Sequence, residues 1–290
     1  MESGVQEEFQ SGSVRMTLRA AVLGSPIQHS LSPAIHNLAY RRLGIDAKYQ
    51  AIEVKESDIE DFLHRTLVDP DHWLGFSLTM PLKEAICVPT LASFVNIDAR
   101  SQRIGSANTL YKEGDRWQGT STDVNGFQYL LKDRDFSSIS ILGAGGTARA
   151  ALAAIDGLDG RTIDRVSIFR RSAHRDELIR RCSKNFEVEI LPWEQVASAW
   201  SSELVINTVP VEGSNELAAS FQPVPLLLDS LYSPWPPPLS SQQFASSGDL
   251  ISGLDLLSAQ ALDQISLMTK VPFDQNEMFD VLLTHLRSLV

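Results

Sequence analysis

A glycine-rich turn between an apolar segment and an alanine-rich segment limits the possible folds more than any other feature of this 290-residue sequence. The apolar segment, residues 138–142, reads as a buried strand, and a helix is predicted over 147–155, ending at Gly157. Glycines at such a junction permit a tight turn, and the helix N-terminus directs N–H groups at an anion such as a pyrophosphate. The residues predicted to bind a dinucleotide are Gly143, Ala144, Gly145, Gly146, Thr147 and Ala148. The alternative is a glycine turn with a structural role only.

A basic cluster after the next predicted strand indicates which dinucleotide would bind. That strand, 166–169, is followed by Arg170, Arg171 and Ser172, with Arg175 close behind. NAD-specific units carry an acidic residue there, which accepts from the ribose 2′-hydroxyl. The chain has a net charge of −11, so the cluster runs against the overall charge and suits a 2′-phosphate. The pattern predicts NADP(H) as the cofactor; the alternative is the solvated start of a helix.

Segments typical of strands and helices alternate along most of the chain, which is the pattern of an α/β protein. The part that begins near Asp123 has the regular spacing of βαβ units and predicts a Rossmann-type, doubly wound parallel sheet. The first part predicts a separate α/β domain with strands at 20–24, 48–54, 73–79 and 106–111 and helices at 33–43 and 57–67. Ser32 is the predicted N-cap of the first helix, and Ser57 with Glu60 forms a predicted capping box for the second. Two final helices are predicted at 254–269 and 276–289.

Composition excludes several classes of protein. Acidic residues outnumber basic ones by 36 to 25, which excludes a general nucleic-acid binder. Cys87 and Cys182 are too few for a disulfide framework and are interpreted as reduced thiols of a cytoplasmic protein. No apolar run approaches the roughly 20 residues of a membrane-spanning helix, and no signal peptide is recognisable. The six histidines lack ligand spacing, so no metal is predicted. Residues 1–16 are predicted to be a disordered leader.

Four short segments of the first domain carry polar residues whose roles the local pattern leaves open. They are 24–33 (GSPIQHSLSP), 75–84 (GFSLTMPLKE), 105–110 (GSANTL) and 119–123 (GTSTD). Taken singly, Ser32 could be only a helix cap and Lys83 only a surface lysine. Asn108 could likewise be a turn residue, and Asp123 the N-cap of a helix.

In this order, and followed by the glycine turn, the four segments resemble the shikimate dehydrogenase family. The family patterns are G-x-P-I-x-H-S-x-S-P, N-x-T-x-P-x-K-E, A-x-N-T-L and T-D-x-x-G. The later part of the chain agrees, because 229–232 and 253–261 match the D-x-x-Y and G-x-x-M-L-x-x-Q-A segments of the family. The resemblance covers nearly the whole chain from Ala20 to Met268.

The resemblance implies a reversible, NADPH-dependent reduction of 3-dehydroshikimate to shikimate, on the route to the aromatic amino acids. Residues 17–122, completed by the helices within 254–290, would form the catalytic domain, and 123–253 the NADP-binding domain. Lys83 and Asp123 would be the catalytic pair, because a cationic donor stabilises the oxygen that becomes negative on hydride transfer and delivers its proton. The residues implied to bind the substrate are Ser30, Ser32, Thr79, Asn108, Tyr232 and Gln260, with the two serines at the carboxylate. Gly253 is expected at the cofactor. The expected partner is the small-molecule substrate, and a monomer and a homodimer are both compatible with the sequence.

Three departures from the family patterns affect these expectations. Ser77 replaces the usual Asn of the second segment, so one substrate contact is lost or bridged by water. The usual Asn-Arg-Thr at the 2′-phosphate is Arg170-Arg171-Ser172, and Leu256 replaces a Met. Two alternatives stay open: an NAD-dependent quinate/shikimate dehydrogenase, and a non-catalytic relative that senses shikimate.

Overall fold

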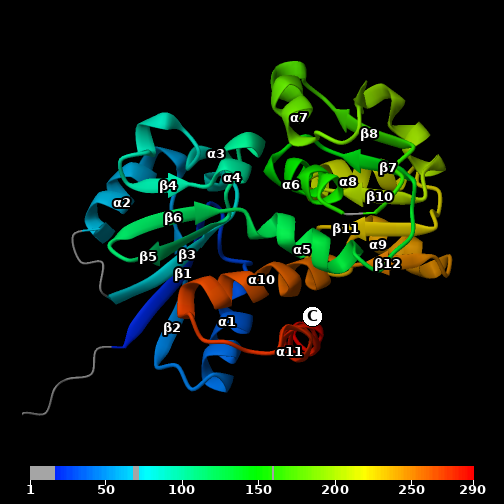
Figure 1. Cartoon of the computed structure of the whole chain (residues 1–290). Coiled ribbons are helices and arrows are strands. Elements are labelled where there is room, and N and C mark those ends of the chain that lie inside the picture. Colours follow the sequence, from blue (N-terminus) through cyan, green and yellow to red (C-terminus); the bar gives the residue numbers. More distant parts are fainter. Residues whose placement is uncertain (1–16, 68–71, 159) are drawn as a thin grey trace, which may run out of the picture.

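The computed structural model describes residues 17–67, 72–158 and 160–290, and the predicted leader lies outside this range. In these residues the strands form two six-stranded sheets, which lie in two lobes with helices between them (Figure 1). The predicted α/β class is confirmed.

The first sheet is mixed and has the strand order β2-β1-β3-β5-β6-β4. Its strands are β1 (Leu18–Gly24), β2 (Ala47–Glu53), β3 (Trp73–Leu78), β4 (Val95–Ile97), β5 (Thr109–Glu113) and β6 (Arg116–Thr120). β1 is parallel to β2 and β3, whereas β5 is antiparallel to β3 and β6. The sequence pattern predicts neither β4 nor β6, because β4 has only three residues and β6 has Trp117 as its single large apolar residue.

Short helices connect these strands. They are α1 (Ser32–Arg42), η1 (Glu56–Asp58), α2 (Ile59–Leu67), α3 (Leu82–Ala85), η3 (Pro89–Leu91) and α4 (Ala99–Ile104). Both predicted caps are wrong. Ser32 is the first residue of α1, whose N-cap is Leu31, and its side chain faces a cavity instead. Ser57 lies inside η1 and donates to Asp58, because this extra turn separates it from the first free N–H groups of α2.

The second sheet is entirely parallel and has the order β12-β11-β10-β7-β8-β9. Its strands are β7 (Ser138–Leu142), β8 (Arg165–Arg170), β9 (Val188–Pro192), β10 (Leu204–Asn207), β11 (Leu226–Asp229) and β12 (Asp249–Ile251). Numbered from β7, this is the doubly wound order 3-2-1-4-5-6, so the Rossmann-type sheet is confirmed. The strand order reverses between β7 and β10, where ligands bind beyond the carboxyl ends of the strands.

The helices and 3₁₀ segments of the second lobe cover both faces of this sheet (Figure 1). They are α6 (Gly146–Asp156), η4 (Ala173–Arg175), α7 (Asp176–Cys182), η5 (Trp193–Ser201), α8 (Val211–Ala218) and α9 (Pro238–Ala245). β7 and β10 are apolar and buried, as expected for parallel strands covered on both faces.

The remaining helices are α5 (Thr122–Leu131), α10 (Gly253–Thr269) and α11 (Gln275–Arg287). α5 and α10 lie side by side between the sheets (Figure 1). A Cβ atom at Gly126 would lie 3.0 Å from the backbone N of Gln260, so glycine at this position favours the close approach of the two helices. α10 and α11 share an apolar core with α1, which includes Ile35, Leu257 and Leu282. The C-terminal helices therefore pack against the N-terminal lobe.

Within the part of the chain that the structure describes, no helix combines the length and apolar character needed to cross a bilayer. The same residues contain no group of three or more His, Cys, Asp or Glu side chains that could hold a metal ion. Cys87 and Cys182 are free thiols.

Candidate active site

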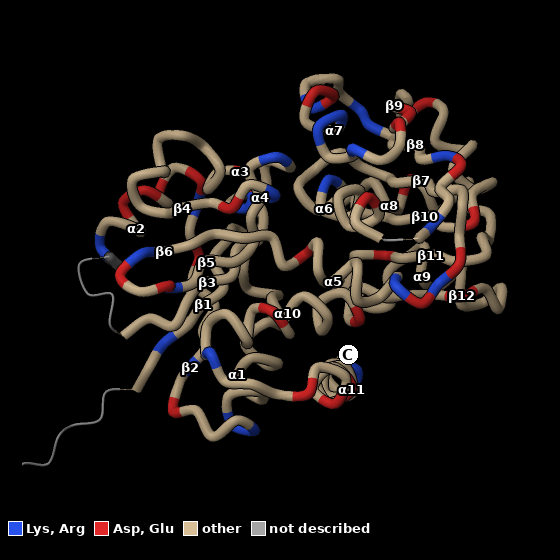
Figure 2. The backbone as a smooth tube through the Cα atoms, viewed as in Figure 1, with Lys and Arg blue, Asp and Glu red and all other residues tan. Residues whose placement is uncertain are grey.

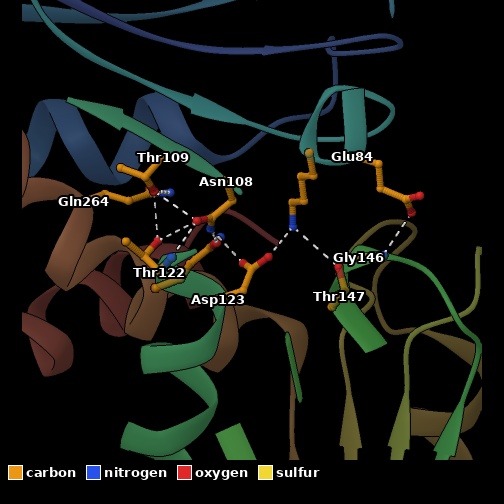
Figure 3. A network of polar contacts seen from close by, with 10 residues as sticks. Glu84, Asn108, Thr109, Thr122, Asp123, Gly146, Thr147 and Gln264 are labelled. Carbon is orange, nitrogen blue, oxygen red and sulfur yellow. Dashed lines mark hydrogen bonds and ion pairs between the residues drawn. The ribbon is translucent and has the colours of Figure 1, made fainter. Parts of the chain in front are cut away.

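An ion pair between the two lobes lies at the centre of the site. Lys83 is in α3, directly after β3, and Asp123 is in the first turn of α5, directly after β6. Lys83 Nζ lies 2.7 Å from Asp123 Oδ2, although the residues are 40 positions apart (Figure 3). The side chain of Asp123 is 3% exposed and that of Lys83 is 19% exposed. The carboxylate is therefore withdrawn from solvent, whereas the lysine side chain is partly accessible.

A buried amide fixes the carboxylate of this pair. Asn108 Nδ2 donates to Asp123 Oδ1 and to Gln260 Oε1, at 2.8 Å each. Asn108 Oδ1 accepts from the backbone N of Thr122 at 2.7 Å, which orients the amide (Figure 3). Asn108 is almost fully buried and is not among the residues that line the cavity in front of the ion pair. Asn108 therefore lies behind Asp123, on the side of the carboxylate that faces away from the cavity described next.

A cavity of about 170 Å³ lies in front of the ion pair. Ser30, Ser32, Thr79, Tyr232 and Gln260, five of the six residues predicted to bind the substrate, line it together with Lys83 and Asp123. Burial raises the pKa of Tyr232, so its hydroxyl is neutral and can donate a hydrogen bond. Thr147, predicted at the dinucleotide, also lines this cavity, as do Ser230 and Gln264, two polar residues to which the sequence analysis assigned no role. One ammonium among hydroxyl and amide groups suits a small, polyhydroxylated anion.

Two polar lining residues of the cavity, Ser77 and Gln264, are held by buried aromatic residues behind them. Ser77 Oγ is hydrogen-bonded to the hydroxyl of the buried Tyr49, so the residue that departs from the family pattern has its own partner. His36 stacks on Tyr49, with ring centroids 4.0 Å apart, and its Nε2 lies 3.1 Å from Gln264 Oε1. Complete burial lowers the pKa of His36 to about 4, so this imidazole is neutral near pH 7.

A larger groove of about 710 Å³ opens beside the cavity. It runs along the glycine turn, whose residues Gly143, Ala144, Gly145, Gly146 and Thr147 line it. Gly143 has a φ of +105°, a conformation that side-chain-bearing residues rarely adopt. Thr79, Lys83 and Thr147 line both spaces, so the groove and the cavity meet at the ion pair. The lining and shape of the groove fit an extended nucleotide.

Two residues predicted to bind the cofactor lie elsewhere. Ala148 is fully buried in α6. Gly253 lines the small cavity, at the start of α10, and not the groove. A Cβ atom there would be 2.3 Å from the carbonyl oxygen of Leu231, so this glycine is required by the approach of two backbone segments.

The basic cluster borders the far part of the groove, where Figure 2 shows Lys and Arg gathered around β8 and α7. Arg170 makes two 2.9 Å hydrogen bonds to Asp176, and this pairing raises the pKa of Arg170 and lowers that of Asp176. Arg171 is 59% exposed and forms a surface ion pair with Glu216, with its guanidinium 5.2 Å from the ring centroid of Trp193. Arg171 is therefore the more available of the two arginines for an anion.

Comparison with known proteins finds relatives that match most of the chain. Residues 22–110 match the family model described as the shikimate dehydrogenase substrate binding domain. The chain is 31% identical over 251 residues to the NADP(+) shikimate dehydrogenase of Dictyoglomus turgidum, covering 83% of this chain and 87% of that protein. The Mycobacterium tuberculosis shikimate dehydrogenase structure has a TM-score of 0.79 at 31% identity, covering 92% and 99% of the two chains. A Thermus thermophilus shikimate 5-dehydrogenase complex with NADP(H) and shikimate has a TM-score of 0.75 at 28% identity, with 92% and 99% covered. The chain belongs to the shikimate dehydrogenase family.

Proposed function

We propose that this protein is an NADP-dependent oxidoreductase that reversibly reduces 3-dehydroshikimate to shikimate. The relatives named NADP(+) shikimate dehydrogenase, about 30% identical over most of the chain, support the reaction and the cofactor. The observation that carries the proposal is the position of Lys83, which lines both the polar cavity and the glycine-turn groove. A group at this junction can contact a ketone in one space while a nicotinamide lies in the other.

The chemistry divides between the two spaces. NADPH, when bound, supplies the hydride that adds to the carbonyl carbon. The Lys83 ammonium stabilises the negative charge that develops on the carbonyl oxygen and donates the proton that completes the alcohol. Asp123 holds Lys83 at 2.7 Å and is itself held by Asn108, so the donor is oriented before the substrate arrives. In the reverse direction Lys83 would act as its neutral amine and accept the hydroxyl proton, and NADP⁺, when bound, would accept the hydride.

The remaining site residues are assigned by their positions. Ser30 and Ser32 bind the substrate carboxylate, and Thr79, Tyr232 and Gln260 contact its carboxylate or ring hydroxyls, because all five line the cavity. Asn108 acts through its partners, since it donates to both Asp123 and Gln260. For the nucleotide, the glycine turn faces the pyrophosphate, and Arg171 with Ser172 faces the 2′-phosphate. Residues 17–122 with 254–290 form the catalytic domain, and 123–253 the NADP-binding domain.

The proposal is tested by the absorbance of the reduced nicotinamide while purified protein is offered 3-dehydroshikimate with NADPH and, separately, with NADH. Oxidation of NADPH much faster than NADH is expected, with shikimate as the product. Faster use of NADH, together with turnover of quinate in the reverse direction, would favour a quinate/shikimate dehydrogenase. Binding of shikimate in a calorimeter without turnover of either nucleotide would show a sensor and refute the proposed activity.

A further inference from the structure

Glu84, the neighbour of Lys83 in α3, extends to the other lobe (Figure 3). Its Oε1 accepts a hydrogen bond from the backbone N of Gly146 at 3.1 Å, at the start of α6. Its Oε2 accepts from Nε and Nη2 of Arg175, at 3.2 Å each. One short helix therefore carries Lys83 at the substrate cavity and, on the next residue, a carboxylate bound to the nucleotide lobe.

A buried arginine strengthens the same junction. The side chain of Arg149 is completely buried, and its Nη2 lies 3.6 Å from Glu84 Oε1. Arg149 also donates to the carbonyl oxygens of Ile104 at 2.6 Å and Gly105 at 3.0 Å, at the end of α4 in the first lobe, and to Ala144 at 2.8 Å in the glycine turn. Burial lowers the pKa of Arg149, and Glu84 opposes this by supplying a nearby negative charge. A buried guanidinium without such a counter-charge is unfavourable, so Glu84 also stabilises the contact between the lobes.

The lobes are in close contact at this point. A Cβ atom at Gly146 would lie 2.4 Å from Ser106 Oγ, which leaves no space for a side chain. The Glu84 side chain links α3, which carries Lys83, to the glycine turn at this close contact, so loss of its hydrogen bonds removes one restraint on the position of Lys83. Yet Glu84 and Arg175 both line the nucleotide groove, where a carboxylate opposes the binding of an anionic cofactor.

We propose that Glu84 is a positioning residue that anchors Lys83 against the nucleotide lobe, and that it does so at the expense of NADPH affinity because it competes with the cofactor phosphates for Arg175. This inference rests on the proposed function. It predicts two effects of a single substitution at Glu84: removal of the charge strengthens NADPH binding and slows the hydride-transfer step. A residue with a merely structural role would weaken both.

The test compares wild-type protein with Glu84→Gln, which has the same size and keeps an oxygen that can accept from Gly146. Glu177→Gln is the matched control, because Glu177 is an exposed residue of α7 paired with Arg181 outside the groove. Two quantities are measured: the NADPH dissociation constant by fluorescence titration, and the single-turnover rate of NADP⁺ reduction by saturating shikimate. The single-turnover rate is independent of product release.

For Glu84→Gln we expect NADPH to bind about three- to tenfold more tightly, as for removal of one partly screened charge. The single-turnover rate should fall about tenfold, because small displacements of a catalytic group are costly. Glu177→Gln should change both quantities less than about twofold. In an Arg175→Ala background, the gain in affinity from Glu84→Gln should disappear.

Unchanged or weaker NADPH binding by Glu84→Gln, or an unchanged single-turnover rate, would overturn the role of Glu84. Equal effects in the Glu177→Gln control, or a gain that persists without Arg175, would do the same. If Glu84→Gln does not fold, Glu84→Asp decides: it keeps the charge with a shorter reach, so it should slow the single turnover at near-wild-type NADPH affinity. Wild-type protein that transfers no hydride would instead refute the proposed function itself.

Discussion

Among the described residues, Thr79, Lys83 and Thr147 line both the cavity and the groove. Lys83 is the only one of these three with an ionisable side chain, and replacement by alanine removes it. At about 3 Å and an effective dielectric constant of roughly 20, an ammonium attracts an oxyanion by about 5 kcal/mol. Lys83 is 19% exposed, so solvent reduces this to roughly 3 kcal/mol, which is about 10²-fold in rate. Loss of proton delivery adds up to about 10²-fold. We therefore expect kcat of Lys83→Ala to fall by about 10² to 10⁴-fold.

The assay is kcat from reduced-nicotinamide absorbance at saturating substrate, combined with an NADPH titration. NADPH affinity should change little, because the contacts of the glycine turn and Arg171 remain. Lys48→Ala, at an exposed position of β2, is the matched control and should keep full activity. The variant leaves Asp123 buried without its partner, so its melting temperature is measured as well. A near-normal kcat in the folded variant would refute the reasoning.

Three further predictions concern other parts of the molecule. Arg171→Ala should weaken NADPH binding with little change in NADH or shikimate affinity, whereas Arg181→Ala should not; equal NADPH affinity of both would exclude the 2′-phosphate role. Gly253→Ala should raise the KM for shikimate and leave NADPH affinity unchanged, because its Cβ would meet the Leu231 carbonyl beside the cavity; loss of NADPH binding alone would contradict this. His36, with its folded pKa lowered to about 4 from 6.5, contributes stability above pH 6.5 that is lost as the pH falls towards 4. The loss amounts to about 3 kcal/mol, so urea unfolding at pH 7 and pH 4 should show a smaller acid effect in His36→Gln; an equal acid effect would disprove it.

Local patterns predicted the elements in which neighbouring residues decide the conformation. The strand, turn and helix around Gly143 form as expected, since glycine content and apolar runs act over a few residues. The caps at Ser32 and Ser57 were predicted from the same local patterns and are wrong. Ser32 lines the cavity, and Ser57 lies in a 3₁₀ turn that precedes the helix. β4 is too short for its three residues to show a period.

Contacts between distant residues needed either the family resemblance or the structure. Lys83 and Asp123 were paired through the resemblance, since nothing in their spacing indicates that they meet. The resemblance implies a substrate contact for Asn108, which stays a prediction, and only the structure shows that its amide is hydrogen-bonded to Asp123, Gln260 and Thr122. For Glu84, the sequence showed only that it follows Lys83, and nothing in it indicated the contact with the nucleotide lobe.

By itself, the sequence determined that the chain is an α/β protein with a dinucleotide-type glycine turn and basic residues beyond the second strand, because these properties follow from periodicity, conformational preference and charge along short stretches. Only the tertiary structure decided which polar groups are exposed to a ligand and which are occupied by one another. Arg170 and Arg171 are adjacent and chemically identical, yet Arg170 is held in a bidentate pair with Asp176 while Arg171 has only an exposed ion pair with Glu216 at the border of the groove. A donor forms hydrogen bonds with the acceptors that the fold brings near it, and three-dimensional packing decides which acceptors these are.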